Sequence, residues 1–119
     1  MLDHIGLRTT HFGALTQFYK AALAPVGYAL KMEYPGVAGF GREFPDLWIS
    51  ADEKGSSNIH LAFRTENRAA VDAFHAAAVA NGGTDNGEPG LRDYTPTYYA
   101  AFIVDPDGNN LEVVCLAEA

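Results

Sequence analysis

Cysteine, positive charge and long apolar runs are all scarce in this chain of 119 residues. Cys115 is its single cysteine, so no disulfide can form within the chain, as is usual for proteins of a reducing compartment. No apolar run approaches the roughly 20 residues that a membrane-spanning helix needs. The first residues also lack the basic and apolar segments of a secretory signal. We therefore expect a cytoplasmic protein.

The charge balance excludes a second large class of proteins. Eight Lys and Arg face fifteen Asp and Glu, which gives a net charge of −7, and the basic residues are scattered singly. Proteins that bind nucleic acid or anionic membranes need clustered positive charge instead. We expect no nucleic-acid partner and no membrane partner. The expected partners are a small-molecule substrate or ligand and a second copy of the chain, in a homodimer.

What the chain does contain is an internal repeat at an offset of 56 residues, which places His4 on His60. The same offset aligns Arg8 with Arg64, Thr9 with Thr65, Phe18 with Phe74, and Gly27 with Gly83. A period of this size indicates two copies of one supersecondary unit, each too small to bury its apolar face alone. We predict one domain over 1–119, with a first module over 1–51, a linker over 52–56 and a second module over 57–119.

Each module reads as a strand, a helix and three short strands. The predicted elements are strand 2–8, helix 11–24 capped by Thr10, and strands 28–34, 37–41 and 47–51, followed by strand 57–64, helix 67–81, a region over 82–96 rich in Gly, Pro, Asn and Asp, and strands 98–104 and 110–116. The predicted fold class is α+β. Two β-α-β-β-β modules form a curved mixed sheet around a cleft, with the helices on its outer face.

The repeat breaks down late in the modules, and the break is informative. There the offset becomes 64, so the second module carries eight extra residues within 82–97. This later offset places Trp48 on Glu112. An enlarged loop in one copy of a symmetric pair is a natural lid or substrate-facing wall.

Three residues form the candidate metal site: His4, His60 and Glu112. The alternation of strand side chains turns all three to the side away from the helices. Two imidazoles and one carboxylate from three strands suit Fe, Mn, Ni or Zn with open coordination positions. A substrate with two adjacent oxygens would occupy those positions, and the metal would act as a Lewis acid. Alternatively, the paired histidines are inherited residues of the fold and hold no metal.

The candidate substrate-binding residues are mostly aromatic: Trp48, Phe40, Tyr94 and Tyr99, together with Arg92. Trp48 is either an aromatic wall for a ring-bearing ligand or part of the core. Arg92, in the enlarged loop, is placed to hold a substrate carboxylate, or else it pairs with one of the many acidic residues. The pattern assigns no residue as the general base.

Several motifs recur in a characteristic order along the chain: Asp3-His4-Ile5, Phe18-Tyr19, His60-Leu61-Ala62-Phe63, Asn81-Gly82-Gly83, and Asp105-Pro106-Asp107-Gly108 followed by Leu111-Glu112. Together they resemble the vicinal oxygen chelate superfamily, which includes glyoxalase I, bleomycin-resistance proteins and extradiol dioxygenases. The resemblance implies a cleft with a divalent metal held by His4, His60 and Glu112. The fourth ligand of the glyoxalase pattern falls on Trp48, which cannot bind a metal. The chain is therefore nearer the three-ligand dioxygenases.

Two functions follow from these observations. The preferred one is a divalent-metal-dependent enzyme of lyase, isomerase or dioxygenase type, acting on a small oxygen-chelating molecule. The alternative is a non-catalytic protein of the bleomycin-resistance kind, which would bind a drug or aromatic ligand against Trp48.

Overall fold

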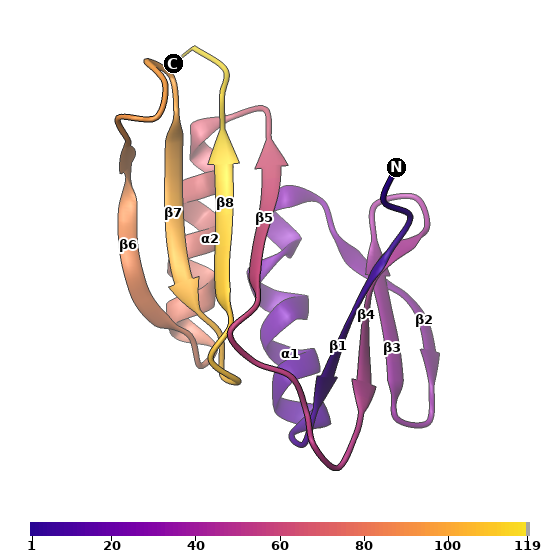
Figure 1. The fold of residues 1–119 in the computed structure, drawn as a ribbon. Coiled ribbons are helices and arrows are strands. Elements are labelled where there is room, and N and C mark those ends of the chain that lie inside the picture. Colours follow the sequence, from indigo (N-terminus) through magenta and orange to yellow (C-terminus); the bar gives the residue numbers. More distant parts are fainter. Residues whose placement is uncertain (119) are drawn as a thin grey trace.

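The computed structural model describes residues 1–118, so Ala119, the last residue of the predicted second module, lies outside the described residues. The elements are β1 (Ile5–Thr9), α1 (Phe12–Ala22), the 3-10 helix η1 (Ala24–Val26), β2 (Ala29–Tyr34), β3 (Val37–Gly41), β4 (Pro45–Ala51), β5 (His60–Thr65), α2 (Arg68–Ala80), β6 (Thr84–Leu91), β7 (Tyr99–Val104) and β8 (Asn110–Cys115) (Figure 1). This order confirms the predicted α+β fold of two β-α-β-β-β modules.

The strands divide between two four-stranded sheets, one for each module. The first sheet has the order β1-β4-β3-β2 and the second the order β5-β8-β7-β6. In each sheet the first strand pairs in parallel with the last strand of its module, which opposes Gly6 to Trp48 and Ala62 to Glu112. Gly6 and Ala62 are themselves equivalent in the repeat, so the registers confirm the alignment of Trp48 with Glu112.

The first helix is held by its apolar face. Its residues Leu15, Phe18, Tyr19 and Ala22 are buried. Pro25 falls in η1 rather than in the α-helix, since proline removes a backbone donor from a helix interior. The predicted cap is wrong by one residue: His11 is the N-cap and makes no side-chain cap bond, while the His11 amide donates to Thr9 Oγ1 at 2.9 Å.

The second helix begins with a side-chain cap. Asn67 accepts a hydrogen bond from the Ala70 amide at 2.7 Å, which satisfies one of the free donors of the first turn. The chain then passes close to the core at Gly83. A Cβ there would lie 2.7 Å from Ile103 and 2.8 Å from Phe18, so only glycine fits.

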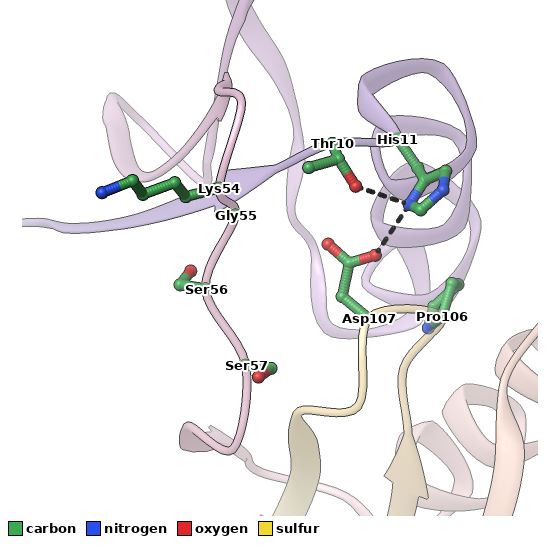
Figure 2. Close-up of a pocket in the computed structure, with 8 residues that line it drawn as sticks. All are labelled: Thr10, His11, Lys54, Gly55, Ser56, Ser57, Pro106 and Asp107. Atoms are coloured by element: carbon green, nitrogen blue, oxygen red, sulfur yellow. Dashed lines mark hydrogen bonds and ion pairs between the residues drawn. The ribbon is translucent and has the colours of Figure 1, made fainter.

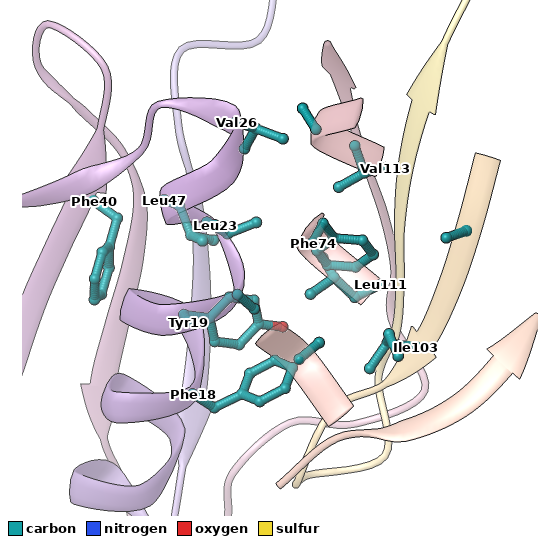
Figure 3. Packing of buried hydrophobic residues seen from close by; sticks show 14 of the residues in the cluster. Phe18, Tyr19, Leu23, Val26, Phe40, Leu47, Phe74, Ile103, Leu111 and Val113 are labelled. Atoms are coloured by element: carbon teal, nitrogen blue, oxygen red, sulfur yellow. The ribbon is translucent and has the colours of Figure 1, made fainter. Parts of the chain in front are cut away.

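Both helices lie between the two sheets, where they form one shared core (Figure 3). Phe40 and Leu47 contribute to it from the first sheet, and Leu111 and Val113 from the second. Each sheet thus has one face covered by helices and one face free of them. We call these helix-free faces the open face of the first sheet and the open face of the second sheet.

A hydrogen bond also joins the two modules within the core. The Tyr19 hydroxyl, on α1, donates to Asp105 Oδ2 in the β7–β8 turn at 2.6 Å.

Within the described part of the chain, none of the helices combines the length and the apolar character needed to cross a membrane.

Candidate functional site

Glu112 and His60 meet on the open face of the second sheet. They lie on the neighbouring strands β8 and β5, and His60 Nε2 is 3.1 Å from Glu112 Oε1. The Glu112 side chain is only 3% exposed, whereas that of His60 is half exposed. A carboxylate buried to this extent needs partners, because burial without them strongly disfavours its charge. Two of the three predicted metal ligands are therefore in contact.

The hydrogen bond made by Nδ1 of His60 determines whether Nε2 carries a proton. His60 Nδ1 lies 3.1 Å from the Asn110 carbonyl oxygen, which only accepts hydrogen bonds, so the network assigns the proton to Nδ1. Nε2 of the neutral ring then presents a lone pair to the Glu112 carboxylate. Two acceptors at this distance need a positive species: either a proton on Nε2 or a cation bound by both.

The other oxygen of Glu112 is held by Tyr98, just before β7. Its hydroxyl donates to Glu112 Oε2 at 2.5 Å. This hydrogen bond, together with partial burial, raises the pKa of Tyr98 to about 12. Tyr98 therefore stays protonated as a donor over the ordinary pH range. The Tyr94 ring packs edge-on against Tyr98 with a centroid separation of 5.0 Å, while Tyr94 itself is largely exposed.

His4 is placed elsewhere. It directly precedes β1 in the first sheet, its side chain is 58% exposed, and its Nδ1 lies 2.6 Å from Asp3 Oδ1. It lines a cavity of about 280 Å³ with Asp46 and Arg64, among others. Among residues 1–118, no three His, Cys, Asp or Glu side chains are grouped closely enough to hold a metal ion. A single copy thus assembles His60 with Glu112 and leaves His4 apart.

Trp48 occupies the centre of the open face of the first sheet. Its neighbours across the sheet are Gly6 on β1 and Gly39 on β3. A Cβ on Gly39 would lie 2.7 Å from the indole ring, so the ring can pack over this position only because residue 39 is a glycine. The half-buried indole belongs to this face and not to the core.

Two of the predicted substrate-binding residues do not belong to the site. Phe40 is fully buried in the core, because its strand turns it toward α1. Tyr99 alternates with Tyr98 and faces the helix side, where its hydroxyl donates to Asp72 at 2.7 Å. We withdraw both. The tyrosine that contacts Glu112 is Tyr98, and strand alternation alone could not select it, since 98 and 99 are adjacent tyrosines at a strand end.

Arg92, in the enlarged loop, contacts two residues close to Glu112, namely Tyr98 and Phe102. Its backbone amide donates to the Tyr98 carbonyl at 2.8 Å, and its guanidinium lies 5.3 Å from the centre of the Phe102 ring. Phe102 is opposite Glu112 in the β7–β8 pairing. Arg92 therefore lies on the same open face as Glu112.

A family model described as the glyoxalase/bleomycin resistance protein/dioxygenase superfamily matches residues 1–113. The chain belongs to this superfamily. Members commonly bind divalent metals and include enzymes such as glyoxalase I. No protein of curated function matches the sequence.

Solved structures of the superfamily share the fold. A glyoxalase/bleomycin resistance protein from Albidiferax ferrireducens T118 is 26% identical, with a TM-score of 0.82 over 94% of this chain and 95% of that chain. A putative glyoxalase from Bacillus halodurans is 22% identical, with a TM-score of 0.78 over 97% and 95%. A glyoxalase I mutant from Zea mays is 24% identical, with a TM-score of 0.71 over 95% of this chain but 46% of that longer chain.

The residues present fit part of a metal site of this superfamily. His60 Nε2 and Glu112 Oε1 are adjacent, and each side chain is oriented by a further hydrogen bond, from Nδ1 to a carbonyl and from Tyr98 to Oε2. Such outer hydrogen bonds are typical of metal-binding histidines and carboxylates. The third predicted ligand, His4, is missing from the group within one copy.

A separate polar pocket lies where the linker passes the β7–β8 turn (Figure 2). It measures about 380 Å³ and includes His11, Lys54 and Asp107. His11 Nδ1 is 3.7 Å from Asp107 Oδ1, and none of the predicted site residues lines this pocket. We therefore attribute it to the contact between the two modules.

Proposed function

We propose that this protein is a divalent-metal-dependent enzyme of the glyoxalase superfamily. Its substrate would be a small molecule with adjacent oxygen donors, and its reaction of the lyase, isomerase or dioxygenase type. One observation carries the proposal: His60 Nε2 faces the buried Glu112 carboxylate at 3.1 Å while Nδ1 is committed to a carbonyl. This arrangement of two acceptors is satisfied by a proton on Nε2 or by a cation, and the proposal is that a metal ion fills the role. The superfamily supplies the precedent for a metal ion in that role.

The roles of the surrounding residues follow from their contacts. His60 Nε2 and Glu112 Oε1 would hold the metal, which when bound supplies Lewis-acid polarisation of substrate oxygens. The Asn110 carbonyl fixes the His60 tautomer. The Tyr98 hydroxyl keeps one oxygen of Glu112 occupied, so that the other is free to bind. Trp48 and Tyr94 are the aromatic surfaces offered to a substrate.

The third ligand would come from a second copy of the chain. His4 and His60 occupy equivalent positions of the repeat, yet His60 lies on β5 of the second sheet while His4 directly precedes β1 of the first. If the first sheet of one copy covers the second sheet of another, His4 joins His60 and Glu112. The cover would also shield exposed apolar side chains such as Met32, Tyr34 and Tyr94. The proposed assembly is therefore a homodimer with two equivalent sites.

Metal content tests the proposal directly. The wild type, His60→Ala and Glu112→Gln are each supplemented with Fe, Mn, Ni or Zn, dialysed and analysed for metal. His75→Ala is the control, because His75 pairs with Asp85 at 2.8 Å away from the site. We expect about one metal ion per wild-type and control chain, and a loss of metal in both site variants. A wild type that retains no stoichiometric metal after supplementation contradicts the proposal.

The placement of Trp48 favours a second candidate function, the binding of an aromatic ligand without catalysis. Its indole is the sole tryptophan and lies on an open face between two glycines. Metal-free protein titrated with catechol or bleomycin would then show a change in tryptophan emission. An unchanged emission with both probes removes this alternative.

A further inference from the structure

The segment before Arg92 is shaped to receive its guanidinium. Arg92 Nη1 donates to the Gly90 carbonyl at 2.9 Å and Nη2 to the Glu88 carbonyl at 2.8 Å. A Cβ on Gly87 would lie 3.1 Å from Nη2, and one on Gly90 would lie 3.4 Å from Nη1. The two glycines therefore leave room for the guanidinium, and the bulged β6 backbone supplies the carbonyls that hold it.

The positive charge of Arg92 has no carboxylate partner in the described part of the chain. In the described part of the chain, every ion pair within 4.0 Å involves a histidine, and none involves Arg92. This is notable in a chain with fifteen acidic residues. A guanidinium has five N–H donors, and two of them are used by the carbonyls of β6. The remaining donors of a half-buried, immobilised cation are available to a ligand.

The position of Arg92 relates this cation to the candidate metal ligands. The Phe102 ring is a common neighbour: Arg92 lies over it at 5.3 Å, and the His60 ring is nearly parallel to it at 6.4 Å between centroids. A planar body lying along this face can reach toward His60 and Glu112 with one end and toward Arg92 with the other.

We propose that Arg92 is the anion-binding residue of the site, and that the substrate carries an oxyanion group, a carboxylate or a phosphate, on a planar or aromatic body. The proposal rests on the proposed function, since it takes the face of His60 and Glu112 as the substrate face. A guanidinium fork binds either oxyanion through two parallel hydrogen bonds. Because the glycine-lined seat and carbonyl contacts pre-orient Arg92, little side-chain freedom is lost on binding.

Matched small probes test the assignment without knowledge of the substrate or the metal. Benzoate, phenyl phosphate and uncharged benzamide are titrated calorimetrically against the wild type, Arg92→Met and Lys20→Met. Lys20 is an exposed residue of α1, so its substitution changes the net charge equally at a distance from the site. The Nε–Hε NMR signal of Arg92 is followed in parallel titrations of the wild type.

We expect an oxyanion probe to bind the wild type about tenfold more tightly than benzamide and to shift the Arg92 signal. Arg92→Met removes that preference, and Lys20→Met keeps it. Whichever of benzoate and phenyl phosphate binds more tightly identifies the oxyanion. Equal binding of charged and uncharged probes, or an Arg92 signal unmoved by both oxyanions, overturns the assignment.

Metal content separates this proposal from the one on which it rests. Arg92→Met should retain metal, since Arg92 is no ligand. If metal binds but the oxyanion preference is absent, the anion assignment fails alone. If the preference depends on Arg92 while the wild type holds no metal, the metal-dependent function fails and the anion site stands.

Discussion

At the scale of single residues, hydrogen bonds around Glu112 and His60 leave one atom of each residue free for a cation. Tyr98 occupies Oε2 of Glu112, and the Asn110 carbonyl occupies Nδ1 of His60. Oε1 and Nε2 remain, 3.1 Å apart. Tyr98 is thus a positioning residue, which acts on a metal only through the orientation and charge of the carboxylate.

Removal of the Tyr98 hydroxyl should weaken metal binding without abolishing it. Substitutions of such outer-shell partners typically lower metal affinity about 10- to 100-fold. We expect Tyr98→Phe to fall in this range in a competition titration with a chelator, while Glu112→Gln loses the site. Tyr99→Phe is the control, because the Tyr99 hydroxyl donates to Asp72 on the helix side of the same sheet. An unchanged affinity in Tyr98→Phe would show that the hydroxyl does not position the carboxylate.

Tyr98→Phe should also change the alkaline titration of the tyrosine hydroxyls. The pKa of Tyr98 is raised to about 12 in the fold, chiefly by its hydrogen bond to Glu112, against about 10 in an unfolded chain. Its contribution to stability is therefore complete below pH 10 and is lost as the pH rises through 12. In the absorbance of tyrosinate, Tyr98→Phe should lack one of the late-titrating groups of the wild type. An identical late phase in both proteins contradicts the shift.

The sequence predicts the residue pair but not its surroundings. His60 and Glu112 could be placed on one face because strand alternation and the repeat fix their direction. The direction of Tyr98 and Tyr99 depends on the residue at which β7 begins, which no pattern specifies. The sequence does not separate Phe40 from the site residues, because an aromatic ring suits a ligand wall and a core equally well. The seat of Arg92 depends on bulges in β6 that local sequence does not reveal.

At the scale of elements, the helices and most strands follow from the sequence, whereas β6 does not. Helix periodicity and the Asn81-Gly82-Gly83 stop predict α2 to within one residue at each end. β6 lies in a region rich in Gly, Pro and Asn, where propensity disfavours a strand. Pairing with β7 overrides this preference, and two register shifts along the pair accommodate the irregular backbone.

Two glycines should respond to alanine in opposite ways. At Gly13, in the first turn of α1, a Cβ would meet nothing within 4 Å, so Gly13→Ala should stabilise the fold by about 0.5 kcal/mol. At Gly83 a Cβ would collide with Ile103, Phe18 and the Ala78 carbonyl, so Gly83→Ala should cost about 1–3 kcal/mol. Urea denaturation measures both. Equal effects of the two substitutions would show that the close packing around Gly83 is not maintained.

At the scale of the whole molecule, the repeat predicts two modules but not how they pack. The sequence predicts that the paired histidines share a cleft, whereas within one copy His60 lies on β5 of the second sheet and His4 directly precedes β1 of the first, with the two helices packed between the sheets (Figure 3). The apolar patterns of α1 and α2 specify only that each must be buried. Whether each helix is buried against its own sheet alone, or also against the other helix, depends on contacts distant in sequence, such as that of Tyr19 with Asp105.

The hydrogen bond between Tyr19 and Asp105, which joins the two modules, should contribute measurably to the free energy of unfolding. The Tyr19 hydroxyl is buried and donates to Asp105 at 2.6 Å, and its pKa is raised well above the usual value, first by burial and then by Asp105. Tyr19→Phe should destabilise the protein by about 1–3 kcal/mol in thermal or urea unfolding. Tyr99→Phe, which loses a solvent-exposed hydrogen bond to Asp72, should have a much smaller effect. Equal stability of Tyr19→Phe and the wild type would mean that water replaces the bond.

The central claim, a metal site shared between two copies, is tested most directly by mixing two variants that each lack one of the predicted histidine ligands. His4→Ala and His60→Ala are each unable to complete a site in their own homodimers. In a mixed dimer, one site loses both histidines, while the other combines His4 of the His60→Ala chain with His60 and Glu112 of the His4→Ala chain. We predict that co-refolded, differently tagged variants yield a heterodimer with one metal ion, half of the wild-type content. A purified heterodimer without metal, beside a wild type that binds it, would contradict the shared site.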